Sequence, residues 1–120
     1  MTVATIGTFK HEENTTSFSA GEVIFKEGDP GDTMYIVQKG EVDISFEGKL
    51  LDSVGPDGVF GEMALVDSQA RSASAIAKTE CKVVVLDEES FKRHVHRTPF
   101  FAVQVMRVLA YRLRRMNEMV

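Results

Sequence analysis

The sequence has little of what disulfide-rich or membrane-spanning proteins need. Cys81 is the single cysteine in 120 residues, so the chain cannot form an internal disulfide, as is usual for proteins of a reducing cytosol. No apolar run approaches the roughly 18 residues of a spanning helix. Residues 1–10 lack the cationic and apolar stretches of a secretory signal. We therefore expect residues 1–120 to form one cytoplasmic domain without a membrane span.

The formal net charge of −4 is divided unevenly along the chain. Residues 1–91 carry 17 acidic and 7 basic side chains, whereas residues 92–120 carry 7 basic side chains and one acidic side chain. A basic end can mark a nucleic-acid face. An acidic body that attracts a basic terminal helix explains the same pattern, and we favour that interpretation. An anion-binding site within the acidic residues 1–91 must then be formed by a local arrangement of hydrogen-bond donors and positive charge.

Short β-prone runs separated by glycine-containing turns fill residues 18–86. Residues 42–46 alternate apolar and polar side chains, and Glu47-Gly48 is typical of a hairpin tip. Many short strands with regular turns favour an antiparallel β-roll or jelly roll. The expected strands are 23–25, 34–37, 42–46, 50–54, 72–77 and 81–86.

Two helices are expected after the strands. Asp87 can cap a helix over about 88–97 whose first turn is acidic, and Thr98-Pro99 can start a longer helix over about 99–117. Apolar residues recur at helical spacing in the second helix, and Arg112 interrupts them. The predicted fold class is mainly β, with a short and a long C-terminal α-helix.

The segment from Gly61 to Ser72 carries the most chemistry. Gly61 permits a close backbone approach, and the helix-forming residues after Glu62 could aim free N–H groups at an anion. The planar guanidinium of Arg71 can donate hydrogen bonds to two phosphate oxygens, and Ser72 adds a hydroxyl. Glu62 cannot bind phosphate but suits a sugar hydroxyl. Together these residue types describe a pocket for a ribose that carries a phosphate.

Gly61-Glu62-Met63-Ala64-Leu65, followed by Arg71-Ser72-Ala73, resembles the phosphate-binding cassette of cyclic nucleotide-binding domains. The resemblance is to the type found in catabolite activator proteins and in regulatory subunits of cyclic AMP-dependent protein kinase. It covers roughly Phe9 to Asn117. It implies a β-roll with terminal helices that binds a cyclic nucleotide without enzymatic turnover and signals through the helices.

Residue roles follow from the resemblance. It implies that Glu62 accepts a hydrogen bond from the ribose 2′-hydroxyl and that Arg71 pairs with an exocyclic phosphate oxygen. Backbone N–H groups of Gly61, Ala64 and Ser72 would point at phosphate or ribose. The base would pack on apolar side chains of the roll, for which Ile44 and Val54 are candidates. Candidates for a lid from the last helix are Arg112, Arg115 and Asn117.

The ligand is expected to be cAMP, with cGMP as the alternative, because bacterial activators with serine beside the cassette arginine use cAMP. No cofactor or metal is expected, because His11, His94 and His96 are scattered along the chain. No base stands near Ser72 in the sequence to activate it as a nucleophile. The chain is therefore predicted not to be an enzyme, and an enzyme of the cupin type would need clustered metal ligands.

The last helix is predicted to form a homodimer or to dock an effector protein, with a seam along Phe101, Val105, Val108 and Met116. No helix-turn-helix follows it, so no direct DNA binding is expected. The chain begins with Met1 and is interpreted as a stand-alone domain, with an excised fragment as the alternative. A protein-interaction module on the same fold that does not depend on nucleotide is the competing function.

Overall fold

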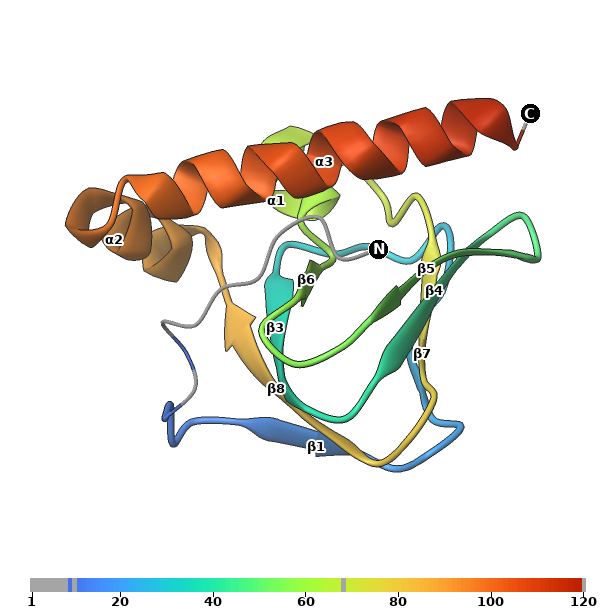
Figure 1. Cartoon of the computed structure of the whole chain (residues 1–120), viewed down its shortest axis with the longest axis horizontal. Coiled ribbons are helices and arrows are strands. Elements are labelled where there is room, and N and C mark those ends of the chain that lie inside the picture. The colour runs from blue at the N-terminus through green and yellow to red at the C-terminus, as the bar shows by residue number, and fades with distance from the viewer. Residues whose placement is uncertain (1–8, 10, 68, 120) are drawn as a thin grey trace.

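In the part of the chain that the structure describes, eight strands form two antiparallel four-stranded sheets that face each other as a roll (Figure 1). The computed structural model describes residues 9, 11–67 and 69–119, so residues 1–8, 10, 68 and 120 of the expected domain lie outside the described residues. This architecture confirms the predicted fold class. One sheet has the order β1 (Thr16–Phe18), β8 (Cys81–Leu86), β3 (Met34–Lys39) and β6 (Val59–Phe60); the other has β2 (Val23–Phe25), β7 (Ser74–Ala77), β4 (Val42–Phe46) and β5 (Lys49–Val54).

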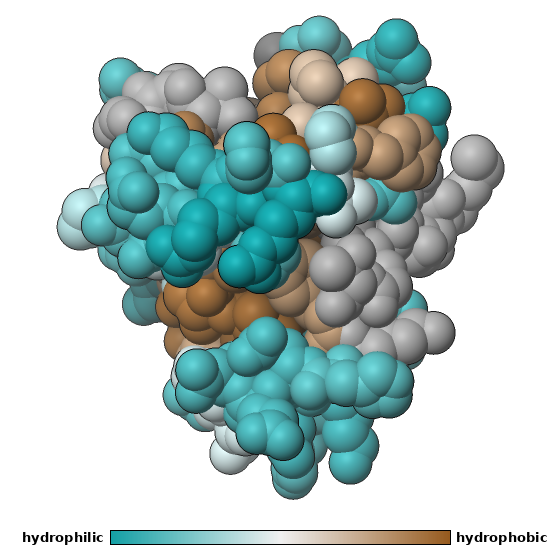
Figure 2. All heavy atoms as spheres, turned by 90° about the vertical axis from the view of Figure 1, so that its left-hand side faces the viewer, coloured by the Kyte–Doolittle hydropathy of each residue, from teal (hydrophilic) through white to brown (hydrophobic). Residues whose placement is uncertain are grey.

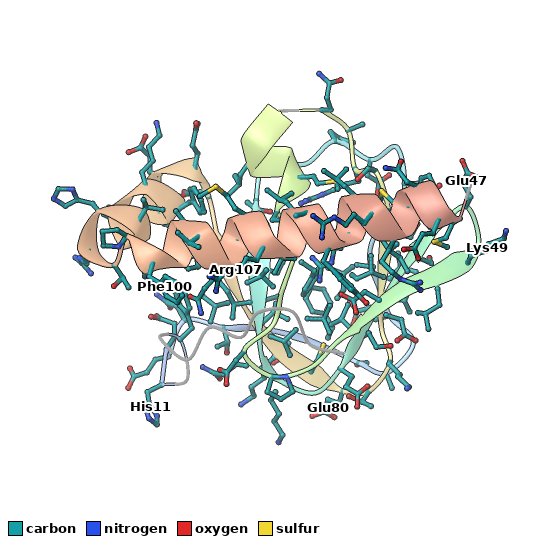
Figure 3. All side chains as sticks on the ribbon, turned by 45° about the horizontal axis from the view of Figure 1, so that its top comes forward. His11, Glu47, Lys49, Glu80, Phe100 and Arg107 are labelled. Atoms are coloured by element: carbon teal, nitrogen blue, oxygen red, sulfur yellow. The ribbon has the colours of Figure 1, made fainter. Side chains whose placement is uncertain are left out.

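The β4–β5 hairpin shows how local sequence sets the register. Glu47 and Gly48 both adopt positive φ, at 51° and 79°, which matches the twist of a two-residue hairpin turn. Phe46 then pairs with Lys49 and Val42 with Val54. Figure 3 places Glu47 and Lys49 at the tip of this hairpin. The alternation predicted from the sequence is observed, because Val42 and Ile44 are buried while Asp43 and Ser45 are only partly covered.

Two apolar clusters hold the roll together. The first fills the space between the sheets and includes Phe25, Val37, Leu51 and Phe60. The second lies between the first sheet and the helices and includes Met34, Ile36, Val59, Phe101, Val105 and Val108. Cys81 belongs to the first cluster and is 1 % exposed. Its burial, and secondarily the charge of Glu22, raises the pKa of its thiol, which favours the protonated form.

The described residues also form three helices, which follow or interrupt the strands: α1 (Met63–Asp67), α2 (Glu88–Arg97) and α3 (Phe100–Glu118). The Asp87 carboxylate caps α2 by accepting from Ser90 N at 2.8 Å, and this bond lowers the pKa of Asp87. Figure 1 shows α3 lying across one end of the roll, with α2 beneath its beginning. Within the described part of the chain, no helix is long and apolar enough to cross a membrane.

The seam predicted for pairing between two molecules is wrong. Phe101, Val105 and Val108 are 2–3 % exposed because they cover the second cluster of their own roll. Met116 packs against the first cluster. The apolar face that the sequence offered for a second helix is therefore used within the molecule, as is usual for an amphipathic surface helix.

Candidate functional site

A small pocket with a cavity volume of about 30 Å³ lies between the second sheet, α1 and α3. Its lining is mostly apolar with a few convergent polar groups, which is typical of small-molecule sites. Its polar lining is provided by the segment around Gly61 and by Arg71, Ser72 and Arg112. Its apolar lining is Phe25, Ile44, Leu51, Met63, Ala64, Ala73 and Met116.

Gly61 is required where β6 ends and the wall of the pocket begins. Its φ is +75°, a conformation that favours glycine. A Cβ at this position would lie 3.0 Å from Arg71 Nη1 and 3.1 Å from Tyr35 Cδ2. The missing side chain lets the Arg71 guanidinium approach the backbone of the segment that carries Glu62.

Arg71 is 7 % exposed and is fixed from several sides. Its Nη1 donates to Thr33 O at 2.9 Å and to Gly61 O at 3.0 Å, and its Nη2 donates to Thr33 Oγ1 at 3.3 Å. The guanidinium carbon lies 4.2 Å from the centre of the Phe25 ring. Arg71 Nε is buried without a hydrogen-bond partner. No carboxylate among the side chains that the structure describes pairs with Arg71.

Glu62 is also buried, at 3 % exposure, and it does have an ionic partner. Arg112 of α3 donates through Nη1 to Glu62 Oε1. The same guanidinium reaches Asp52 Oδ2 from Nη2 at 3.2 Å and from Nε at 3.3 Å, and Nη2 also donates to Val59 O at 2.6 Å. We call these three charged residues, Asp52, Glu62 and Arg112, the carboxylate–arginine cluster. It joins β5, the pocket wall and α3.

The other residues predicted for the site are placed differently. Ala64 is buried and lines the pocket, and exposed Ser72 lines it with a hydroxyl that donates to Met63 Sδ at 2.9 Å. Ile44 is buried and faces the pocket. Val54 is equally buried but lies in the core and is not part of the pocket lining.

The three lid candidates have separate positions on α3. Arg112 lines the pocket, but its guanidinium is engaged in the carboxylate–arginine cluster. Arg115 donates to Leu51 O at 3.4 Å and pairs with Glu118 at 3.5 Å. Asn117 is exposed and does not line the pocket. Met116, which the sequence did not select, is the other α3 residue in the lining.

Sequence reasoning also missed Thr33, Leu51 and Asp52. Thr33 and Asp52 contact the two buried arginines across sequence separations of 38 and 60 residues, so no local motif indicates them. Met116 could have been found, because it follows Arg112 by four residues and therefore shares its face of the helix.

The arrangement can bind a small ligand that has an anionic group and a hydroxyl close together. A buried guanidinium can pair with the anion, and a carboxylate at the neighbouring wall can accept from the hydroxyl. Apolar side chains from β4, β5 and α3 can cover a flat ring. Among the described residues, no group of three histidine, cysteine, aspartate or glutamate side chains could hold a metal ion.

Comparison with known proteins finds one family over most of the chain. The model of the cyclic nucleotide-binding domain matches residues 15–98. A CRP-like cAMP-activated global transcriptional regulator of Mycobacterium tuberculosis is 37 % identical over 106 residues, which cover 84 % of this chain and 47 % of the relative. A cAMP-dependent protein kinase regulatory subunit of Emericella nidulans is 46 % identical over 82 residues, covering 67 % of this chain and 20 % of the relative.

A solved structure agrees with the sequence relatives. The catabolite activator protein of Thermus thermophilus matches with a TM-score of 0.75 and 32 % identity, over 88 % of this chain and 52 % of that chain. The present chain spans about half or less of the length of these curated relatives. The family match and the fold agree over most of the chain, and the chain belongs to the cyclic nucleotide-binding domain family.

Proposed function

We propose that this chain is a cytosolic sensor module that binds a purine cyclic mononucleotide, cAMP in preference to cGMP, without hydrolysing it. The observation that carries the proposal is the buried Arg71 guanidinium at the pocket, which has no carboxylate partner among the described residues and an unpartnered Nε. A buried cation of this kind is suited to an anion from outside the chain. The names of the two relatives, cAMP-activated and cAMP-dependent, support the choice of nucleotide.

In the proposed complex, the cyclic phosphate lies against Arg71, the Ser72 hydroxyl and the backbone N–H groups of Gly61, Ala64 and Ser72. Glu62 accepts from the ribose 2′-hydroxyl. The base lies among Ile44 of β4, Leu51 of β5 and Met116 of α3, which line the pocket together. Met116 thus replaces Arg112, Arg115 and Asn117 as our candidate for the residue that covers the base. Leu51 takes the place of Val54.

Signalling is proposed to pass through α3. Glu62, the proposed ribose acceptor, is bonded to Arg112 of that helix, and Met116 of the same helix lines the pocket where we propose that the base lies. A ligand that contacts both groups binds more tightly when α3 is in one position than when it is in another. The ligand therefore shifts the equilibrium between these positions by the difference in its binding free energy.

Recovery of the bound nucleotide tests both the binding and the absence of turnover. The chain is incubated with cAMP or cGMP, separated from free ligand and denatured, and the released nucleotide is chromatographed. We expect intact cyclic nucleotide, because the described residues hold no group of metal ligands, and Glu62, the carboxylate that lines the pocket, is paired with Arg112. Release of the linear monophosphate would contradict the non-enzymatic assignment. If no nucleotide stays with the protein after the separation, the result would contradict stable binding of a cyclic nucleotide.

The outer face of α3 is our proposed dimer contact. Five residues spaced by three and four positions follow it: Val103, Met106, Ala110, Leu113 and Asn117. Met106 and Leu113 are 57 % and 51 % exposed. Figure 2, which faces the α2 end, shows hydrophobic residues at the top beside the hydrophilic surface of α2. Figure 3 shows Phe100 and Arg107 on α3, and the Arg107 guanidinium carbon lies 5.3 Å from the Phe100 ring centre.

Light scattering tests this contact. We expect a dimer at concentrations well above micromolar, and Leu113→Glu should convert it to a monomer because a buried carboxylate would lack a partner. The matched control is Val23→Glu, an exposed apolar residue on β2, which should leave the dimer intact. A wild-type monomer with and without nucleotide would contradict the homodimer and leave this face for another protein.

A further inference from the structure

The carboxylate–arginine cluster holds two carboxylates against one guanidinium. The side chains of Arg112 and Glu62 are 5 % and 4 % exposed, and that of Asp52 is 20 % exposed. Burial of an ion pair is costly unless the charges are well matched and hydrogen-bonded. One carboxylate is enough to neutralise the charge of Arg112. Neutralisation of Arg112 therefore does not account for the second carboxylate, that of Asp52.

The contacts of Arg112 divide between the two carboxylates. Nε and Nη2, which form one edge of the planar guanidinium, both donate to Asp52 Oδ2. Glu62 receives Nη1 through Oε1, and no described donor bonds to its Oε2. Glu62 and Arg112 line the pocket, whereas Asp52 is not part of the lining. Asp52 therefore contacts Arg112 from outside the pocket lining.

The sharing of Arg112 between two carboxylates affects how Glu62 is bonded. An arginine edge prefers to pair with both oxygens of one carboxylate in a bidentate arrangement. If Asp52 did not occupy the Nε–Nη2 edge, Glu62 would be the one carboxylate left in the cluster for that guanidinium. Both oxygens of Glu62 and its full charge could then be drawn to Arg112. With Asp52 present, the cluster keeps a formal charge of −1, and Glu62 Oε2 stays available as an acceptor.

We propose that Asp52 is a positioning residue for ribose recognition: by holding the Nε–Nη2 edge of Arg112, it leaves Glu62 Oε2 free to accept from a ribose 2′-hydroxyl. This inference rests on the proposed function. Asp52 makes the module distinguish a ribonucleotide from a 2′-deoxyribonucleotide without touching either ligand. The ligand class is thus narrowed to cyclic nucleotides with an intact 2′-hydroxyl.

The test compares dissociation constants for cAMP and 2′-deoxy-cAMP, measured by calorimetry on the full chain. Wild type should favour cAMP by about tenfold or more, the value of a hydrogen bond to a charged acceptor. In Asp52→Asn this ratio should fall by at least about threefold, through weaker cAMP binding, while 2′-deoxy-cAMP binds within about twofold of wild type. Asp52→Glu, which keeps the carboxylate, should retain most of the discrimination.

A merely structural role for Asp52 gives a different result. Both nucleotides would then weaken equally in Asp52→Asn and the ratio would stay at the wild-type value, which would overturn the proposal. Asp43→Asn is the matched control, because Asp43 on β4 accepts a hydrogen bond from Ser53 and does not contact Arg112. In this variant the ratio of the dissociation constants for 2′-deoxy-cAMP and cAMP should equal the wild-type ratio. If Asp52→Asn does not fold, Asp52→Ser carries the same comparison with the same two outcomes. Failure of wild type to bind either nucleotide would instead contradict the proposed function itself.

Discussion

Arg71→Ala is expected to abolish most cyclic nucleotide binding. Removal of one partner from a buried charge pair costs about 2–5 kcal/mol, which corresponds to a loss of affinity of roughly thirtyfold or more. In this protein Arg71 is the buried cation of the pocket that no described carboxylate neutralises, so the phosphate would lose its main counter-charge. Fluorescence competition or calorimetry with cAMP provides the measurement.

The variant also removes contacts that stabilise the fold. Arg71 bonds Thr33 and Gly61 and packs on Phe25, so unfolding must be measured beside binding. Arg71→Lys keeps the charge but lacks the planar guanidinium that can donate to two phosphate oxygens. It should remain folded and bind cAMP more weakly than wild type. Arg93→Ala on exposed α2 is the control for loss of a surface cation. Wild-type affinity in a folded Arg71→Ala protein would contradict the proposed phosphate site.

Arg112→Met is expected to cause the largest loss of stability. It removes the cation from the carboxylate–arginine cluster and leaves Glu62 as a buried and Asp52 as a partly buried uncompensated charge. Breaking a buried pair in this way costs about 3–5 kcal/mol, a large part of the stability of a small domain. Urea unfolding followed by circular dichroism measures the change. Arg115→Met, which removes a half-buried arginine one turn along α3, should cost much less.

A compensated variant separates charge from packing. When Arg112→Met is combined with Glu62→Gln and Asp52→Asn, no buried charge remains, and most of the lost free energy of unfolding should return. If the triple variant is as unstable as Arg112→Met alone, the packing of the arginine stem, and not its charge, holds α3 on the roll. A single variant as stable as wild type would contradict the structural role of the cluster.

The part of the pocket lining that the segment from Gly61 to Ser72 provides could be predicted because its residues are local in the sequence. Gly61, Glu62, Arg71 and Ser72 stand close together in the sequence, and each residue type has a limited set of roles toward a phosphorylated sugar. The β-roll could be predicted for a similar reason. Strands such as 42–46 alternate cleanly, and Glu47-Gly48 fixes the hairpin by its backbone conformation.

The partners of the buried arginines could not be predicted, because they come from distant segments. Arg112 meets Glu62 and Asp52 across 50 and 60 residues. The sequence signal was present but incomplete: one arginine in an otherwise apolar helical stripe implies a buried counter-charge without saying which one. Helical periodicity alone also fits a surface for a second molecule, whereas in the structure the stripe covers the roll.

The two apolar faces of α3 explain why the dimer seam was misassigned. Phe101, Val105 and Val108 form one face, and Met106 and Leu113 lie on the other. Helical periodicity identifies both faces but does not say which one the roll covers. The structure assigns the first to the roll.

Calorimetric titration of the wild-type chain with cAMP tests the central claim most directly, with cGMP titrated in parallel. The account predicts saturable binding at one site per chain, tighter for cAMP, and loss of that signal in a folded Arg71→Ala protein. A preference for cGMP above about tenfold, or 1.4 kcal/mol, would contradict the base assignment alone. No saturable binding of either nucleotide at millimolar concentration would contradict the account.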